Sequence, residues 1–383
     1  MKSIASGRPP SSADRQRRPM ALTDETRATA SRGSDLPATR EGVVSVLVAT
    51  HRDLALLERA LDVFTTMPGI EIVIVNNDPS QDVQSWAATH VPDARVIEMG
   101  FDAGYPRAMN AAIAASRGEF VLLLDSDLFL SSSYVPELIR FLASRPKIGA
   151  AGGKLLRYDL QMDCETDMID TVGVLLGHNR RITGRGEGER DHGQYNDAAQ
   201  VFGIDGAGMF LRRSALESVA LDGEYFDSSF FMHKEDTDLC WRLRLAGWEI
   251  WYVPSAAGAH GRTTRGLGRR PYLSGLSAFH RNERAKRPSV RFHATKNQWL
   301  MLTKNEDGRT LLRDLPLILG RESCVLLYNA IFSPSTLLAV RDYFRLLQPT
   351  MRKRRLIKER QVIRPSDMHA WFGTGPSRAR QSR

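Results

Sequence analysis

Residues 122–130 read LLLDSDLFL, and the interpretation of the whole chain begins with them. Three leucines run directly into Asp125, Ser126 and Asp127, which is typical of a buried strand that ends at the edge of a sheet. Two carboxylates one residue apart offer the hard oxygen ligands that Mg²⁺ or Mn²⁺ prefers, and they leave positions for diphosphate oxygens. The alternative is a turn in which the aspartates only cap the next element.

Upstream of this stretch, short β-rich segments alternate with helical segments, which predicts a parallel sheet. We expect strands over 43–50, 70–78, 94–98 and from 119 onward, and helices over 54–67 and 105–118, the latter capped by Gly118. Three strands end in polar clusters, namely Thr50-His51-Arg52, Asn76-Asn77-Asp78 and Asp125-Ser126-Asp127. In open α/β sheets ligands bind at the carboxyl ends of the strands, so these clusters are expected to face one cleft.

Beyond residue 127 the pattern becomes more mixed. It predicts helices near 134–144 and 214–219 and strands near 149–156, 169–175 and 207–212. Residues 176–199 are polar and rich in glycine, and they are expected to form a long mobile loop in which His178 and His192 are exposed.

A second informative stretch, FDSSFFMHKEDTDLCWRLRLAGWEIWYVP, covers residues 226–254. Glu235 and Asp236 open a predicted helix that ends at Gly247. Asp236 shares the inward stripe of this helix with Leu239, Cys240 and Leu243, whereas Asp238 lies off that stripe. Asp236 is therefore either a helix cap or a catalytic base. The strand that follows leads to His260, which either serves packing or completes a metal site begun by carboxylates.

The composition is that of a soluble chain, with 383 residues, 42% hydrophobic and 25% charged. This length accommodates one large domain and an appendage. The three cysteines are odd in number and lack metal-ligand spacing, which argues against a disulfide framework or a zinc site and favours a reducing cytoplasm.

Charge is divided unevenly along the chain. Formal net charges are +4 over residues 1–40, −13 over 41–260 and +18 over 261–383, and the sharpest basic cluster is MRKRRLIKER at 351–360. Such a region suits an anionic membrane surface or nucleic acid, and the alternative is a solvated, partly disordered tail. No nucleic-acid-binding module or regular aromatic pattern accompanies it, so peripheral membrane contact is the expectation and nucleic acid is not.

Neither end of the chain reads as a membrane span. Residues 1–40 lack the apolar core of a signal peptide and are expected to form a disordered leader. Residues 315–340 are apolar but interrupted by Arg321, Glu322 and Pro334, so they are expected to lie on a membrane at most. Residues 263–383 are expected to be mostly helical.

Several segments, in their order and spacing, resemble one family: VLVATHR, IVIVNND, FDAGYPRAMNAAI, DSD, GAGMFLRR, FFMHKEDTDLCWRLRLAGW and the later His260. They are similar to family 2 glycosyltransferases of the GT-A fold, especially the rhamnosyltransferase-like and galactofuranosyltransferase-like branches, over about residues 43–262. The resemblance implies an α/β, Rossmann-like fold with a mixed, mostly parallel central sheet flanked by helices and a helical C-terminal extension. The expected division is a leader at 1–40, a catalytic domain at 41–262 and a basic region at 263–383.

The resemblance also assigns roles to residues of this chain. Asp125, Asp127 and His260 match the metal ligands, for Mg²⁺ or Mn²⁺, and Asp236 matches the general base of inverting members. The expected contacts to the nucleoside-diphosphate sugar are Thr50, Arg52, Asn77, Asp78, Asp102, Arg107, Asn110 and Ser126. The chain departs from the family where it has Asn76-Asn77 in place of paired aspartates at the second strand.

These residues imply an inverting hexosyl- or deoxyhexosyltransferase that works on a glycan or lipid-linked glycan acceptor in cell-surface polysaccharide synthesis. It is expected in the cytoplasm, at the inner face of the membrane. One alternative is a sugar nucleotidyltransferase, although ATHRDLALLERA offers no glycine-rich phosphate loop. The other is a non-catalytic module, either glycosyltransferase-like or binding nucleic acid through its basic residues.

Overall fold

β1 (Arg40–Thr50) is the central strand of the N-terminal half of the sheet. The structure, a computed structural model, describes residues 38–51, 54–262, 284 and 286–373. β1 pairs in parallel with β2 (Ile70–Asn76) and with β4 (Gly118–Leu124), and β3 (Arg95–Glu98) continues the parallel sheet beyond β2. Both faces of β1 are buried, as a parallel strand covered by helices requires.

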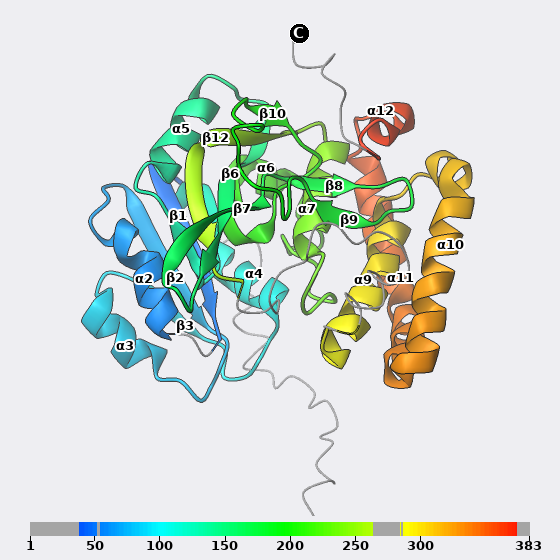
Figure 1. The fold of residues 1–383 in the computed structure, drawn as a ribbon, viewed down its shortest axis with the longest axis horizontal. Coiled ribbons are helices and arrows are strands. Elements are labelled where there is room, and N and C mark those ends of the chain that lie inside the picture. Colours follow the sequence, from blue (N-terminus) through cyan, green and yellow to red (C-terminus); the bar gives the residue numbers. More distant parts are fainter. Residues whose placement is uncertain (1–37, 52–53, 263–283, 285, 374–383) are drawn as a thin grey trace, which may run out of the picture. The chain divides into compact units, whose positions relative to one another are not determined.

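Beyond β4 the sheet becomes mixed (Figure 1). β11 (Phe210–Arg212) lies antiparallel between β4 and β6 (Ile148–Asp159). Next comes β12 (Glu249–His260), parallel to β6, and the short β10 (Ala199–Gln200) at the edge. β5 (Leu128–Leu130) pairs with the end of β12, and β7 (Cys164–Thr171) pairs with β6. The predicted fold class is confirmed.

Helices cover both faces of this sheet. One core cluster joins it to α2 (Leu54–Thr65), α3 (Val83–His90) and α5 (Tyr134–Ala143). The opposite face packs against α4 (Tyr105–Ala115), α6 (Arg213–Ser218) and α7 (Glu235–Leu245). Gly118 is not the predicted cap of α4, because Ser116 ends the helix in an extended conformation and Gly118 already begins β4.

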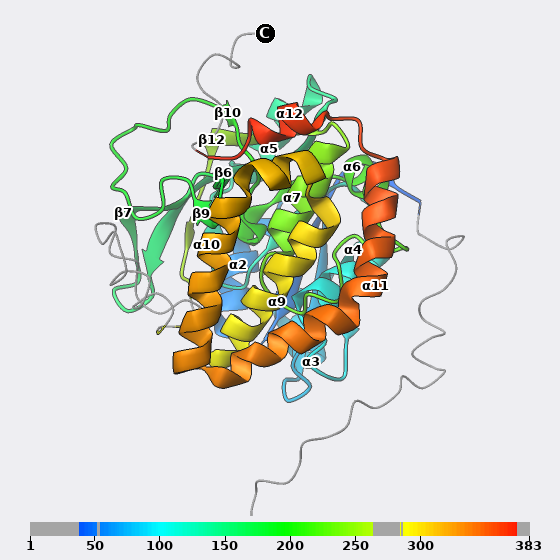
Figure 2. The same ribbon diagram turned by 90° about the vertical axis from the view of Figure 1, so that its right-hand side faces the viewer.

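In the described part of the C-terminal region, four α-helices lie on the far side of α7 (Figure 2): α9 (Pro288–Asn305), α10 (Gly308–Phe332), α11 (Leu338–Glu359) and α12 (Pro365–His369). A third core cluster packs Trp241 and Leu245 of α7 against residues of α9, α11 and α12. Because the sheet covers its other face, α7 is buried on every side from Thr237 to Leu245.

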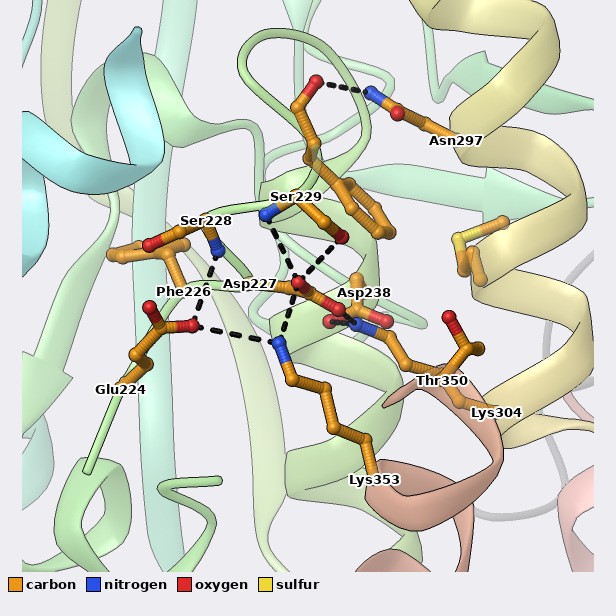
Figure 3. A network of polar contacts seen from close by, with 12 residues as sticks. Glu224, Phe226, Asp227, Ser228, Ser229, Asp238, Asn297, Lys304, Thr350 and Lys353 are labelled. Atoms are coloured by element: carbon orange, nitrogen blue, oxygen red, sulfur yellow. Dashed lines mark hydrogen bonds and ion pairs between the residues drawn. The ribbon is translucent and has the colours of Figure 1, made fainter. Parts of the chain in front are cut away.

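The position of Asp238 follows from this packing. It lies off the sheet-facing stripe, as predicted, yet it is fully buried because the C-terminal helices cover that side of α7. Asp238 pairs with Lys304 of α9 at 3.0 Å and with Arg242 at 3.1 Å. Lys304 also pairs with Asp227, which accepts a hydrogen bond of 2.7 Å from Lys353 of α11 (Figure 3). Burial alone would raise the pKa of Asp227, but the two lysine charges lower it well below its ordinary value.

The basic cluster at 351–360 is not a solvated tail. It belongs to α11, and several of its cations contact the sheet domain or α9. Lys353 pairs with Asp227, Arg352 pairs with Asp222 at 3.1 Å, and Arg354 donates to the Thr303 carbonyl at 2.7 Å. Much of the predicted basic surface is therefore used inside the fold.

Residues 176–199 also differ from the expected loop. β8 (Val174–Leu176) pairs with β9 (Ile182–Gly184) in a separate antiparallel ladder. Arg180, between them, is fully buried and pairs with Glu306 at 2.6 Å and Asp314 at 2.7 Å, both from the C-terminal region. Sequence pattern alone could not anticipate these partners, because they lie more than a hundred residues away. His178 and His192 are exposed, as predicted.

The segment that leads into α7 has an unusual backbone. Positive φ angles occur at the non-glycine residues Phe231 (65°), His233 (68°) and Lys234 (74°), a conformation that costs free energy unless neighbours hold it. Asn297 of α9 supplies this support, because its amide donates hydrogen bonds of 2.7 to 3.0 Å to the carbonyls of Phe230, Met232 and His233. The C-terminal helices thus hold the entry to α7.

The N-terminus of α4 holds the same segment from the other side. The Tyr105 N–H donates to the Phe231 carbonyl at 2.8 Å. Gly104 has φ 77°, and a Cβ on it would lie 2.5 Å from that carbonyl oxygen. Only glycine allows this close approach.

Replacing Lys304 by alanine should strongly destabilise the protein, because Asp227 and Asp238 would stay buried with too little positive charge. We expect the free energy of unfolding to fall by about 3–5 kcal/mol, measured by urea unfolding. Arg140→Ala is the control, since Arg140 is 72% exposed in its ion pair with Glu137 and should matter by less than about 1 kcal/mol. Equal effects of both substitutions would contradict the importance of the buried network.

Gly104→Ala should cost more stability than Gly100→Ala. The two glycines have similar φ angles, 77° and 72°, but no atom lies within 4 Å of a Cβ built on Gly100. Backbone strain alone should cost about 1 kcal/mol at Gly100, and the clash with Phe231 should raise the cost above about 2 kcal/mol at Gly104. Thermal unfolding of both variants measures this difference. Equal losses of stability would show that the close contact with Phe231 does not add to the cost of the substitution.

Candidate active site

The end of β4 and the end of β12 bring together the three side chains predicted to bind a metal ion, Asp125, Asp127 and His260. β5 pairs with β12 so that His260 lies opposite Leu128, one residue after Asp127. The Nε2 atom of His260 is 3.3 Å from Asp127 Oδ1 and 3.9 Å from Asp125 Oδ2. One ligand atom from each of the three side chains lies within 4.8 Å of the other two. Ser126 is half-buried between the aspartates.

A further carboxylate fixes the orientation of the imidazole. His260 Nδ1 is 3.0 Å from Asp170 Oδ2, and Arg262 Nε donates to Asp170 Oδ1 at 2.5 Å. A carboxylate on one ring nitrogen turns the other nitrogen toward the metal position, which is the usual arrangement of metal-binding histidines. Burial alone would lower the pKa of His260, but hydrogen bonds to Asp127 and Asp170 raise it to about 10. This surplus of negative charge around the imidazole fits a divalent cation.

Asp236 lies at the start of α7 and contacts a separate glycine-rich segment. Its Oδ2 accepts a hydrogen bond of 3.2 Å from the N–H of Gly206, and its Oδ1 accepts one of 2.6 Å from the N–H of Thr237. The cap position belongs to Lys234, which makes no side-chain capping bond. Asp236 is therefore bonded across two segments rather than serving as a simple helix cap.

The glycine-rich segment η1 (Gly206–Gly208) connects Asp236 to the metal ligands. The N–H of Asp125 donates to the carbonyl of Ala207 at 3.3 Å. The end of β4 and the start of α7 therefore meet at this short turn. Burial, together with the charge of Asp205, raises the pKa of Asp236 to about 6. Burial, together with the charge of Asp236, raises the pKa of the adjacent Glu235 well above its usual range.

Three of the predicted nucleotide contacts lie together at the ends of β1 and β2. The N–H of Asn77 donates to the Thr50 carbonyl at 3.1 Å, and its side-chain amide donates to Asp102 at 3.1 Å. Thr50 Oγ1 is buried and has no hydrogen-bond partner among the described residues. An unsatisfied buried hydroxyl favours a ligand at this position. Arg52, predicted to lie beside Thr50, falls outside the described residues.

The other predicted donor contacts differ in their surroundings. Asp78 accepts from the N–H and hydroxyl of Ser80, as in a turn. Asn110 accepts hydrogen bonds from two backbone N–H groups and donates one to the carbonyl of Phe226 at 2.8 Å. These bonds favour a structural role for Asn110 over a contact with the nucleotide sugar. Arg107 is exposed on α4.

Sequence reasoning missed several polar residues of the site: Tyr105, Asp170, Asp205 and Arg262. The Tyr105 hydroxyl is buried without a partner among the described residues, and burial and the nearby acids raise its pKa well above the usual range. Asp205 directly precedes the GAG sequence and Arg262 follows His260 by two residues, so both lie beside recognised motifs. Only the fold shows that Asp170, ninety residues before His260, contacts it.

A second group of potential ligand atoms lies elsewhere, at His178, Asp314 and His369. Arg180 lies 2.7 Å from the same Asp314 oxygen that His369 contacts at 2.9 Å. Because a guanidinium already neutralises this carboxylate, the group serves as an internal ion-pair cluster between the sheet domain and the C-terminal helices.

Comparisons with known proteins agree with this geometry. Residues 41–289 match the domain described as glycosyltransferase like family 2. The N-acetylglucosaminyl-diphospho-decaprenol L-rhamnosyltransferase of Mycobacterium tuberculosis is 26% identical over 263 residues, which cover 63% of this chain and 82% of that protein. The uncharacterized protein y4gI of Sinorhizobium fredii is 26% identical over 222 residues, or 56% of this chain and 24% of that protein.

Among solved structures, the mannosyltransferase PcManGT of Pyrobaculum calidifontis, in complex with GDP-Man and Mn²⁺, is similar with a TM-score of 0.44 and 16% identity. That alignment covers 88% of this chain and 90% of the mannosyltransferase.

The domain match decides between the two enzyme classes that the sequence left open. It spans more than half of the chain and includes each residue predicted for the site, from Thr50 to His260. Glycosyl transfer is therefore favoured over nucleotidyl transfer, and the predicted resemblance is confirmed. The chain belongs to glycosyltransferase family 2.

Proposed function

We propose that this enzyme transfers a sugar, with inversion, from a nucleoside-diphosphate sugar to a hydroxyl of a glycan or lipid-linked glycan. One observation carries the proposal: η1 joins the end of β4, with Asp125 and Asp127, to the start of α7, with Asp236. Two groups of carboxylates with different surroundings thus lie at one edge of the sheet. This arrangement separates a site for the leaving diphosphate from a site for proton removal.

Asp125, Asp127 and His260 would hold Mg²⁺ or Mn²⁺, with Asp170 keeping the imidazole in place. When bound, the cation neutralises the charge that develops on the diphosphate leaving group. The donor's nucleoside would lie against the strand ends, where Thr50, Asn77 and Asp102 gather. Arg52, Asp78, Arg107, Asn110 and Ser126 stay predicted contacts to the same donor, with Asn110 the weakest of them.

Asp236 would act as the general base. A carboxylate with a pKa of about 6 is largely ionised at neutral pH, yet it is more basic than an ordinary aspartate. It removes the proton from the acceptor hydroxyl as that oxygen attacks the anomeric carbon on the face opposite the diphosphate. This geometry of attack inverts the anomeric configuration.

The acceptor class rests on the relatives. The rhamnosyltransferase of Mycobacterium tuberculosis, by its name, acts on an N-acetylglucosaminyl-diphospho-decaprenol, and this chain covers 82% of it. We therefore propose a diphospholipid-linked glycan as the acceptor and cell-surface polysaccharide synthesis as the process, at the cytoplasmic face of the membrane.

Asp127→Ala should abolish divalent-cation binding and, with it, tight donor binding. Electron paramagnetic resonance of Mn²⁺ alone measures the first, and calorimetry with UDP-, dTDP- and GDP-sugars in Mn²⁺ or Mg²⁺ measures the second. Asp170→Asn should weaken Mn²⁺ about 10- to 100-fold, because the imidazole loses its orienting partner. Asp167→Ala is the control, since Asp167 is 57% exposed in an ion pair with Arg190. If no donor binds with either cation, the proposed function is wrong.

Asp236→Asn should lower kcat by about 10²- to 10⁴-fold and leave donor affinity unchanged, because a general base acts only in the transition state. In the wild type, kcat/KM should decrease as the pH falls through about 6, since protonation of Asp236 removes the base. This decrease should be absent from the residual activity of the variant. A collapse of donor affinity would instead show that Asp236 supports the donor site.

A further inference from the structure

α10 carries an apolar surface that no described residue covers. Five large aliphatic side chains on it are more than half exposed: Leu312, Leu317, Leu319, Leu327 and Ile331. We call these residues the α10 face. Figure 2 shows α10 at the outside of the C-terminal helices, with α9 behind it. By length and composition alone, α10 could cross a membrane. Only 28% of its most apolar 18-residue stretch is buried inside the protein.

The charged residues around the α10 face are arranged at its ends. No exposed charged side chain lies between Arg313 and Arg341, since Asp314 and Glu322 are buried and Arg321 is 21% exposed and paired with Glu322. Arg309 and Arg313 are exposed at the start of α10. Arg341 and Arg345 are exposed at the start of α11, beyond the apolar residues Leu337 and Leu338. The apolar surface is thus bordered by arginines at both ends.

The inner side of α10 shows that the helix does not cross a bilayer in this fold. Glu322 accepts a hydrogen bond of 2.7 Å from Trp299 Nε1 of α9, and Asp314 pairs with the buried Arg180. A spanning α10 would have to give up these partners and place both carboxylates in hydrocarbon, which is costly. An amphipathic helix of this kind lies along the interface instead, with one face in the acyl boundary.

We propose that the α10 face docks on an anionic phospholipid bilayer, with the helix parallel to the membrane plane. A contiguous exposed apolar patch marks an interaction surface, and lipid headgroups of negative charge complement the bordering arginines. A second copy of the chain fits less well, because a two-fold interface would bring the same arginines near one another. The proposal goes beyond the transfer reaction and does not depend on it.

The two exposed cysteines of the described chain give a direct test. Cys324 lies on the exposed side of α10, and Cys164 is exposed on the distant β7. A polarity-sensitive fluorophore on Cys324, in a Cys164→Ser background, should shift to shorter wavelength with vesicles of phosphatidylglycerol and phosphatidylcholine. The same fluorophore on Cys164, in a Cys324→Ser background, should not shift. The full chain should also float with these vesicles.

Variants of the α10 face separate its apolar and charged parts. Leu319→Gln with Leu327→Gln should reduce vesicle binding at least tenfold. Arg313→Gln or Arg345→Gln should each reduce it about fivefold, and only when the vesicles are anionic. Met162→Gln is the matched control, since Met162 is 75% exposed on the β6–β7 turn, and it should leave binding unchanged.

Two results would overturn the proposal. The first is a failure of membrane binding by this surface: either the full chain does not float with anionic vesicles, or the double leucine variant binds vesicles as well as the wild type. The second is self-association: the emission of the Cys324 fluorophore shifts with rising protein concentration in the absence of lipid, and light scattering gives a doubled mass. That result would assign the α10 face to a second copy of the chain. Donor binding in the double leucine variant should equal that of the wild type, so failure of membrane docking is distinguishable from failure of the proposed function.

Discussion

The burial of α7 from Thr237 to Leu245 constrains the rest of the structure. A helix packed against a sheet on one face and against helices on the other cannot leave its charges in water, so each charge needs a partner inside the protein. Asp238 finds Lys304, and Lys304 also neutralises Asp227. The catalytic half of the fold therefore depends on the C-terminal helices for charge balance as well as for apolar contact.

The same dependence explains the uneven charge of the chain. The sheet region carries −13 and the C-terminal region +18, and part of this difference is neutralised within the fold. Lys304, Lys353 and Arg180 link sheet-domain and C-terminal segments through ion pairs that are largely buried. Breaking one partner of such a pair is costly, which favours one defined arrangement of the two parts. Near α10, Arg309, Arg313, Arg341 and Arg345 stay exposed.

Local patterns in the sequence were sufficient to predict the sheet and to select Asp125, Asp127 and His260, which the fold brings together. Residues 120–124 before Asp125 are all apolar, and the helix that begins at Glu235 has Leu239, Cys240 and Leu243 at helical spacing, so both elements could be predicted from the sequence. The pairing of Asp238 with Lys304, of Asp170 with His260 and of Arg180 with Asp314 could not, because each of these pairs joins segments far apart in the chain. The 176–199 segment was misjudged for this reason: its polar composition conceals a fully buried Arg180 whose partners belong to α10 and the turn before it.

The two groups of acids at the sheet edge receive different environments from these contacts. Asp127 lies against His260, and the raised pKa of this imidazole favours its protonated form. Binding of a metal cation would release that proton. Within the described residues, the hydrogen-bond partners of Asp236 include no cationic side chain, and burial beside Asp205 makes it more basic. Since η1 contacts both groups, a shift of α7 would move Asp236 relative to Asp125 and Asp127. The supports of α7, including Asn297 and Lys304, therefore help to fix the distance between these two groups of acids.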